Sequence, residues 1–127
     1  QEVYGMVGEL PRPMRPEELA AMSETALNTR IQYVPTGREI LTVAVCGGAG
    51  SDFMGEALAA GAEAFLTGEV KHHEWFMAAE HGLCLMAAGH RATEHPAMPQ
   101  LAKPLRAALP GLPVEVFDSD PARWGGI

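Results

Sequence analysis

The 127-residue chain has few basic residues and no long apolar run. Nine lysines and arginines stand against 16 aspartates and glutamates, which gives a formal net charge of −7. Proteins that depend on phosphate contacts carry a basic excess, so a nucleic acid is not expected as a partner. No apolar run approaches the roughly 18 residues of a membrane-spanning helix, and no signal peptide is recognisable. The composition therefore predicts a cytoplasmic protein without membrane association.

Cysteine is also scarce, with only Cys46 and Cys84, each inside an apolar run. This usage is typical of reduced, buried thiols that act as small core residues. A helix that began directly after Cys46 would lower the pKa of its thiol and favour a nucleophile, which is the less common alternative.

Segments of strand character alternate with segments of helical character from residue 40 onward. Strands are predicted at 40–46, 64–66, 83–87 and 114–117, and helices at 52–60, 71–81 and 98–109. The leading segment, 1–39, is predicted to hold one helix at 16–27, with short strands near residues 3–7 and at 31–34. Such alternation forms βαβ units, and continuous apolar strands are covered on both faces.

The predicted fold class is therefore α/β. We expect a single domain over residues 1–127, in which 40–127 forms the βα core. Its layered sheet has mostly parallel strands, with helices on both faces.

Four polar or glycine-rich clusters follow the predicted strands, at 47–51, 67–69, 89–94 and 118–120. In open α/β sheets, ligands bind outside the carboxyl ends of the strands. The clusters therefore predict one site at that edge of the sheet.

The first cluster, Gly47–Ser51, is a glycine-rich turn between a predicted strand and helix. Such a turn can present backbone amides to an anion. The dinucleotide fingerprint needs Gly where Phe53 stands, and the P-loop needs Lys where Glu56 stands. Two interpretations remain open. The glycines either make a tight turn, or Gly47, Gly48 and Gly50 hold an anionic part of a substrate.

Two histidine motifs carry metal-ligand chemistry. His72-His73-Glu74 lacks the second His that a zinc-protease helix needs, because Met77 stands at that position. His90 and Glu94 are four residues apart, so on a helix their side chains project to one side. Zinc, iron and manganese accept both donors, but two ligands are too few for a stable site. The spacing also fits a solvated helix start with a local His–Glu hydrogen bond.

Longer stretches of the sequence resemble a known family. In order, they are Tyr4–Leu10, Val43–Gly50, Gly61–His73, Ala88–Glu94 and Phe117–Pro121. Together they resemble the carboxyl-terminal half of the Nif-three-like family, whose members are called GTP cyclohydrolase type-two homologues. The resemblance covers nearly the whole chain.

The resemblance implies half of a two-domain α/β fold with a dinuclear site for a divalent metal (zinc, iron or manganese). It also implies a homo-oligomer, which in the family is a hexamer. His90 and Glu94 match the family's late metal ligands, and Glu94 is also the candidate catalytic base. Thr67, Glu69 and His73 are expected near the pocket without ligating.

The family's other ligands, a His-His pair followed by Pro and an Asp, have no counterpart in this chain. We therefore expect an incomplete site that a missing amino-terminal half or a partner chain completes. The start at Gln1 favours a fragment of a longer protein.

Three functions remain open on this basis. The first is a metal-dependent hydrolase of an unknown small molecule, in which two metals activate a water. The second is a metal-binding, metal-delivery or adaptor protein without catalysis. The third is a domain that binds a nucleotide or another anion through the Gly47–Gly50 loop.

Overall fold

The fold is known from a computed structural model, which describes residues 4–117. The chain divides into two compact units, residues 1–93 and residues 94–127. The organisation of residues 1–127 as a single domain stays a prediction. Among the described residues, no helix is both long and apolar enough to cross a bilayer.

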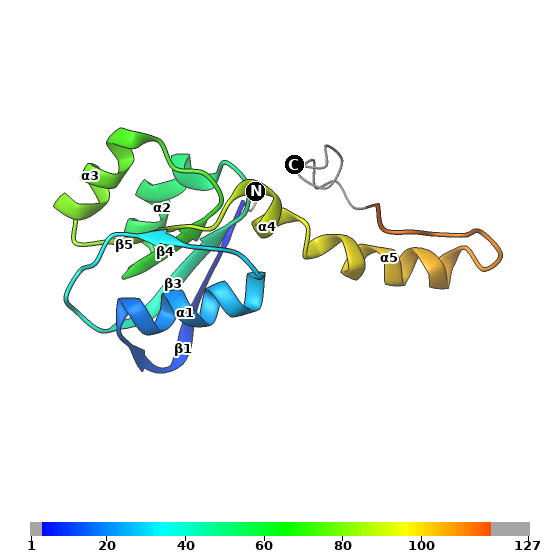
Figure 1. The fold of residues 1–127 in the computed structure, drawn as a ribbon, viewed down its shortest axis with the longest axis horizontal. Coiled ribbons are helices and arrows are strands. Elements are labelled where there is room, and N and C mark those ends of the chain that lie inside the picture. The colour runs from blue at the N-terminus through cyan, green and yellow to red at the C-terminus, as the bar shows by residue number, and fades with distance from the viewer. Residues whose placement is uncertain (1–3, 118–127) are drawn as a thin grey trace. The chain divides into compact units, whose positions relative to one another are not determined.

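A five-stranded sheet forms the centre of the first unit (Figure 1). Its order across the sheet is β1 (Met6–Met14), β3 (Ile40–Cys46), β4 (Ala64–Thr67), β5 (Cys84–Ala87) and β2 (Gln32–Tyr33). The three central strands are parallel, whereas β1 and β2 pair antiparallel to their neighbours at the two edges. The predicted βαβ units are therefore confirmed in the core, and both edge strands come from the leading segment.

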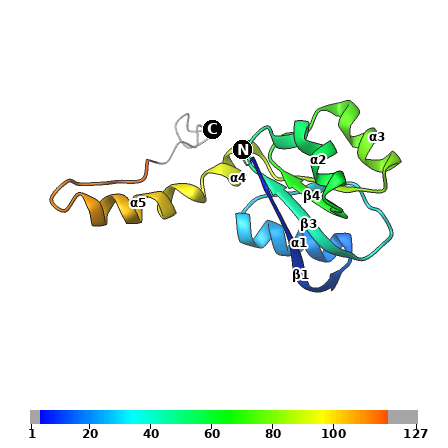
Figure 2. The same ribbon diagram turned by 180° about the vertical axis from the view of Figure 1, so that it is seen from behind.

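Helices cover both faces of this sheet, as Figures 1 and 2 show. α1 (Pro16–Leu27) packs on one face, against a core that includes Leu19, Ala64 and Met86. α2 (Met54–Ala59) and α3 (His72–Glu80) contribute Met54 and Ala78 to a second core, which includes Ala44, Phe65 and Leu85. Neighbours such as Ala64 and Phe65 enter different cores because successive strand side chains point to opposite faces.

Helix α1 begins and ends at the predicted residues. Pro16 occupies the first turn, where its missing N–H leaves no hydrogen bond unmade, and Glu17 and Glu18 favour the helix dipole. Asn28 ends the helix in the left-handed conformation, with φ of 50°, and its N–H bonds to the carbonyl of Glu24.

Four predicted elements differ from the structure. The short strand expected near residues 3–7 is the longer β1, which spans Met6–Met14 and pairs with β3. The helix at 52–60 begins as a 3-10 turn, η1 (Gly50–Phe53), before α2. The helix at 98–109 is α5 (Ala97–Ala108), which continues through Pro104 and follows a short α4 (His90–Glu94). The strand at 114–117 is wrong, because this segment has no regular secondary structure. A strand needs a neighbour for its N–H and C=O groups, and no strand among residues 4–117 pairs with it.

Gly61 supports one local prediction about how α2 ends. It follows the helix with φ of 80°, and its N–H bonds to the carbonyl of Leu58. For an L-residue with a Cβ atom, this backbone conformation is about 1–2 kcal/mol less favourable than for glycine, and the cost is larger when the side chain is branched. No neighbouring atom lies within 4 Å of an added Cβ, so the cost is backbone strain.

We therefore expect Gly61→Val to lower the free energy of unfolding by about 2 kcal/mol in urea titrations. Gly55→Ala is the matched control, because Gly55 lies inside α2 with open space around its Cβ position. Alanine there is expected to stabilise by about 0.5–1 kcal/mol. An unchanged midpoint for Gly61→Val would contradict the strain.

Candidate functional site

Three loops meet at the carboxyl ends of the parallel strands. The amides of Gly68 and Glu69 both donate to the carbonyl of Gly48, each at 3.0 Å. The amide of Gly89 donates to the carbonyl of Gly68 at 2.9 Å. Backbone hydrogen bonds thus join the loops after β3, β4 and β5, which confirms their predicted convergence. The fourth cluster, 118–120, lies outside the described residues.

Two threonine hydroxyls hold the glycine-rich turn in place. The hydroxyl of Thr67, which is fully buried, accepts a hydrogen bond from the amide of Gly50 at 3.1 Å. The hydroxyl of Thr93 accepts one from the amide of Gly48 at 2.9 Å. Gly48 also has φ of 64°, which favours glycine. These contacts favour the tight turn over anion binding, since the amides of Gly48 and Gly50 already donate within the fold. Gly47 is exposed beside them.

His90 and Glu69 form a pair at this junction. Nδ1 of His90 lies 3.2 Å from Oε1 of Glu69, with side-chain exposures of 46% and 61%. A carboxylate at Nδ1 favours the tautomer whose proton is on Nδ1 and whose lone pair is on Nε2. Metal-binding histidines are commonly oriented by a carboxylate in this way. The pair forms because Glu69 follows β4 and His90 follows the neighbouring parallel strand β5.

The other predicted site residues have different surroundings. His73 lies exposed in the first turn of α3, and the ring of His72 packs edge-on against Phe76. Glu74 is buried, and its carboxylate accepts the amide of Lys71 at 2.7 Å. The His72-His73-Glu74 motif therefore forms a capped helix start.

The second predicted ligand, Glu94, is exposed at the end of α4, where the second compact unit begins. Within residues 4–117, no three His, Cys, Asp or Glu side chains gather in an arrangement that could hold a metal ion.

A hollow with both polar and apolar lining residues adjoins Glu69. It has a volume of about 370 Å³ and is also lined by Ser51, Asp52 and Lys71. The ammonium of Lys71 lies 3.2 Å from a carboxylate oxygen of Asp52, and Ser51 is buried. The sequence analysis placed Ser51 in the glycine-rich cluster but did not single out Asp52 or Lys71. The hollow has room for a small group beside Glu69.

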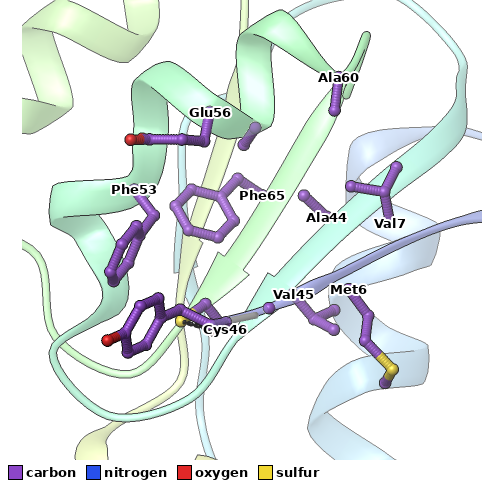
Figure 3. A pocket seen from close by; sticks show the side chains of 12 residues that line it. Met6, Val7, Ala44, Val45, Cys46, Phe53, Glu56, Ala60 and Phe65 are labelled. Carbon is purple, nitrogen blue, oxygen red and sulfur yellow. Dashed lines mark hydrogen bonds between the residues drawn. The ribbon is translucent and has the colours of Figure 1, made fainter. Parts of the chain in front are cut away.

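A larger hollow, of about 490 Å³, lies elsewhere on the first unit (Figure 3). The rings of Tyr4 and Phe53 stack there with their centres 5.1 Å apart, and Phe65 also lines the space. Its lining is mostly apolar and includes neither Glu69 nor His90, so its size does not make it the functional site.

The thiols fit the structural interpretation rather than nucleophilic catalysis. Both cysteines are free, and the thiol of Cys46 donates to the carbonyl of Tyr4 at 2.7 Å. Burial raises the pKa of Cys46, although this residue is only half-buried rather than fully enclosed as predicted. Burial raises the pKa of Cys84 to about 12. A raised pKa keeps the protonated thiol, which is the weaker nucleophile.

These features define an α/β protein with a mixed sheet, in which hydrogen-bonded loops hold a carboxylate–histidine pair at the carboxyl edge. The chain belongs to the Duf34/NIF3 (NGG1p interacting factor 3) family, which it matches over residues 1–122. This confirms the resemblance seen in the sequence.

Curated relatives carry the name GTP cyclohydrolase 1 type 2 homolog. The chain is 38% identical to the Pseudomonas aeruginosa relative over 89 residues, which cover 70% of this chain and 35% of the relative. It is 38% identical to the Nostoc sp. relative over 108 residues, which cover 82% of this chain and 41% of the relative. The chain thus spans less than half the length of these relatives.

Solved structures confirm the fold class. Protein ybgI, described as of unknown function, matches with a TM-score of 0.78 and 36% identity over 84% of this chain and 44% of that one. Staphylococcus aureus protein SA1388 matches with a TM-score of 0.80 and 26% identity over 92% of this chain and 36% of that one.

Proposed function

We propose that this chain contributes part of a divalent-metal site, with His90 as one ligand. The observation that carries the proposal is the carboxylate of Glu69 at Nδ1 of His90. That contact orients the ring and favours the tautomer with its lone pair on Nε2, the form in which an imidazole nitrogen binds a metal. Zinc, iron and manganese all accept imidazole nitrogen, so the donor fits the metals expected from the sequence.

Glu94 is the proposed second ligand, because it matches the family's late Glu four residues after His90. The remaining donors of a dinuclear site would come from the portion of the relatives that this chain does not span, or from a partner chain in a homo-oligomer. His90 and Glu94 would hold the metal, while Glu69 and Thr67 would fix the loops that carry or adjoin His90.

The proposed activity is metal-dependent hydrolysis of a small polar molecule. When bound, a metal pair supplies an activated water and stabilises charge on the reacting oxygens. Glu94 would accept a proton from the water. The hollow lined by Ser51 and Lys71 would bind polar groups of the substrate next to Glu69. A metal-delivery protein would use the same ligands without turnover, so metal binding is the first property to test.

Mn²⁺ titration followed by NMR tests the ligands even if the affinity is weak. We expect the ring protons of His90 to broaden at the lowest Mn²⁺ concentrations, and those of His81 to stay sharp. His81 is a suitable internal control, because its Nδ1 lies 2.7 Å from the carbonyl of Met77 at the end of α3.

Equilibrium dialysis at a fixed free zinc concentration, with the bound zinc measured by mass spectrometry, provides the second readout because it also detects weak binding. Relative to the parent chain, we expect His90→Ala to lose the bound zinc, Glu69→Gln to weaken binding about 10- to 100-fold, and His81→Ala to match the parent. Broadening that is equal at His81 and His90, or zinc retained by His90→Ala, would exclude His90 as a ligand.

A further inference from the structure

The hollow beside Glu69 contains a buried hydroxyl group to which the fold gives no hydrogen bond. Ser51 is 5% exposed and lines this hollow. Within residues 4–117, its hydroxyl makes no hydrogen bond to another residue. Most buried side-chain hydroxyls have a hydrogen-bond partner. A ligand in the hollow would provide that partner, and the volume of about 370 Å³ lies within the range of small-molecule sites.

The charged groups around the hollow favour an uncharged ligand that carries hydroxyl groups. Glu69 and Asp52 contribute two carboxylates to its lining, and Lys71 contributes one ammonium, 3.2 Å from Asp52. The excess of negative charge disfavours an anion such as phosphate, and the ammonium disfavours a simple cation. A ligand hydroxyl suits both signs, because it donates to a carboxylate and accepts from an ammonium. Ala49 and Val70 add apolar contacts for the C–H groups of the same ligand.

The hollow lies between the loops that follow two neighbouring parallel strands. Its lining residues 49, 51 and 52 come after β3, and residues 69–71 come after β4. Because α2 connects the two strands, they form one βαβ unit. In βαβ units that bind dinucleotides, a glycine-rich turn follows the first strand, and a carboxylate about 20 residues later accepts a hydrogen bond from a ribose hydroxyl. Glu69 has this spacing from the glycine-rich turn and stands at the equivalent strand end.

The glycine-rich turn lacks the diphosphate-binding features of such a unit. Phe53 stands where the fingerprint requires its third glycine. The amides of Gly48 and Gly50 donate to the hydroxyls of Thr93 and Thr67, so these two amides are not available to a phosphate oxygen. The unit therefore keeps the carboxylate that contacts a sugar but not the phosphate-binding turn, which agrees with the negative charge of the hollow.

We propose that this hollow binds a sugar through two adjacent hydroxyl groups. Glu69 accepts a hydrogen bond from one hydroxyl, and Ser51 forms a hydrogen bond with the other. The contact between Glu69 and His90 uses Oε1, which leaves Oε2 for the sugar. Binding of the sugar requires no metal. That a sugar derivative is also the substrate of the hydrolase rests on the proposed function, since Glu69 both lines the hollow and contacts His90.

The test is an NMR titration of the 127-residue chain with methyl β-D-ribofuranoside, a sugar whose ring cannot open. A metal chelator is present throughout, so the result does not depend on the zinc experiment, and neither failure implies the other. We expect saturable shifts of the amide signals of Ser51, Glu69 and Lys71 at millimolar sugar, without shifts in α1. The 2-deoxy analogue lacks one of the two adjacent hydroxyls and is expected to bind about 3- to 10-fold more weakly.

Three variants assign the contacts. Ser51→Ala is expected to raise the Kd of the ribofuranoside about 3- to 10-fold, and Glu69→Gln to raise it about 5- to 10-fold through loss of a charged acceptor. Ser23→Ala is the matched control, because Ser23 is also buried but lies on α1 and does not line the hollow. It is expected to bind like the parent chain. Since Ser51→Ala breaks no hydrogen bond within the described residues, its melting temperature is expected to match the parent's.

Weaker binding of both the deoxy analogue and Ser51→Ala, with Ser23→Ala unchanged, supports the proposal. No saturable shift with the ribofuranoside overturns it, as does equal binding of the deoxy analogue or an unchanged Kd in Ser51→Ala. Inorganic phosphate and glycine are titrated in parallel. Tighter binding of phosphate would assign the hollow to an anion, tighter binding of glycine would assign it to a zwitterion, and either result overturns the proposal.

Discussion

Gly68→Ala is expected to lower the free energy of unfolding by about 3 kcal/mol, because the junction of the three loops has no room for a methyl group. An added Cβ would stand 2.5 Å from the carbonyl oxygen of Gly48, 2.8 Å from the hydroxyl of Thr93 and 3.0 Å from the carbonyl oxygen of Gly89. Two of these atoms are backbone, so a rotamer change cannot relieve the overlap. Gly68 is itself hydrogen-bonded to Gly48 and Gly89, so any shift disturbs both neighbouring loops.

Urea unfolding measures this loss, and Gly8→Ala is the matched control. Gly8 lies in the edge strand β1, where no neighbouring atom comes within 4 Å of the Cβ position. We expect less than about 1 kcal/mol of change there, because alanine adds little strain to an exposed strand. Parent-like stability of Gly68→Ala would show that the loops are not packed as closely as the structure indicates.

Phe65→Ala is expected to destabilise the protein by about 3–5 kcal/mol, the largest effect of the proposed substitutions. Phe65 is 1% exposed in β4 and lies in the core that includes Ala57 of α2 and Leu85 of β5. Removing its ring loses apolar burial and leaves a cavity that rigid neighbours close only in part. Chemical denaturation followed by circular dichroism measures the change.

Val45→Ala gives the corresponding comparison on the neighbouring strand. Val45 is half-buried in β3 and borders two hollows, so its truncation removes fewer close contacts. We expect a loss of no more than about 1.5 kcal/mol. If Phe65→Ala were as mild as Val45→Ala, the position of Phe65 in the core would be wrong.

The sequence predicted the fold best where local chemistry and burial agree. Pro16 and the acids that follow it mark the start of α1, and Gly61 marks the end of α2, because each residue suits one backbone conformation. The continuous apolar run of 40–46 predicted the bounds of β3 because a central strand is defined by its own composition. The run at 114–117 is equally strand-like, yet it has no neighbour in the described chain.

At the candidate site, too, the sequence predicted the local features but not the contacts between them. The resemblance named His90, Glu69 and Thr67, and the order of the loops predicted that their clusters would meet. The sequence could not predict which of these residues would contact one another, because residues far apart in the chain come together only through the register of the strands. That register brings Glu69 to Nδ1 of His90 and the hydroxyl of Thr67 to the amide of Gly50. The buried Ser51 beside Glu69 also follows from how the loops pack.

The sequence by itself determined the α/β class, the parallel core strands, the family and the edge of the sheet at which the candidate site lies. These properties depend on periodicity, on turn residues and on motifs, all of which are local in the chain. The tertiary structure alone decided that the glycine-rich turn is closed by Thr67 and Thr93, and that Glu69 orients His90. It also left Leu101 and Leu105 of α5 exposed. Which side chains contact one another, and which ones another element buries, depends on how distant parts of the chain meet in space. No single segment of the sequence contains that information.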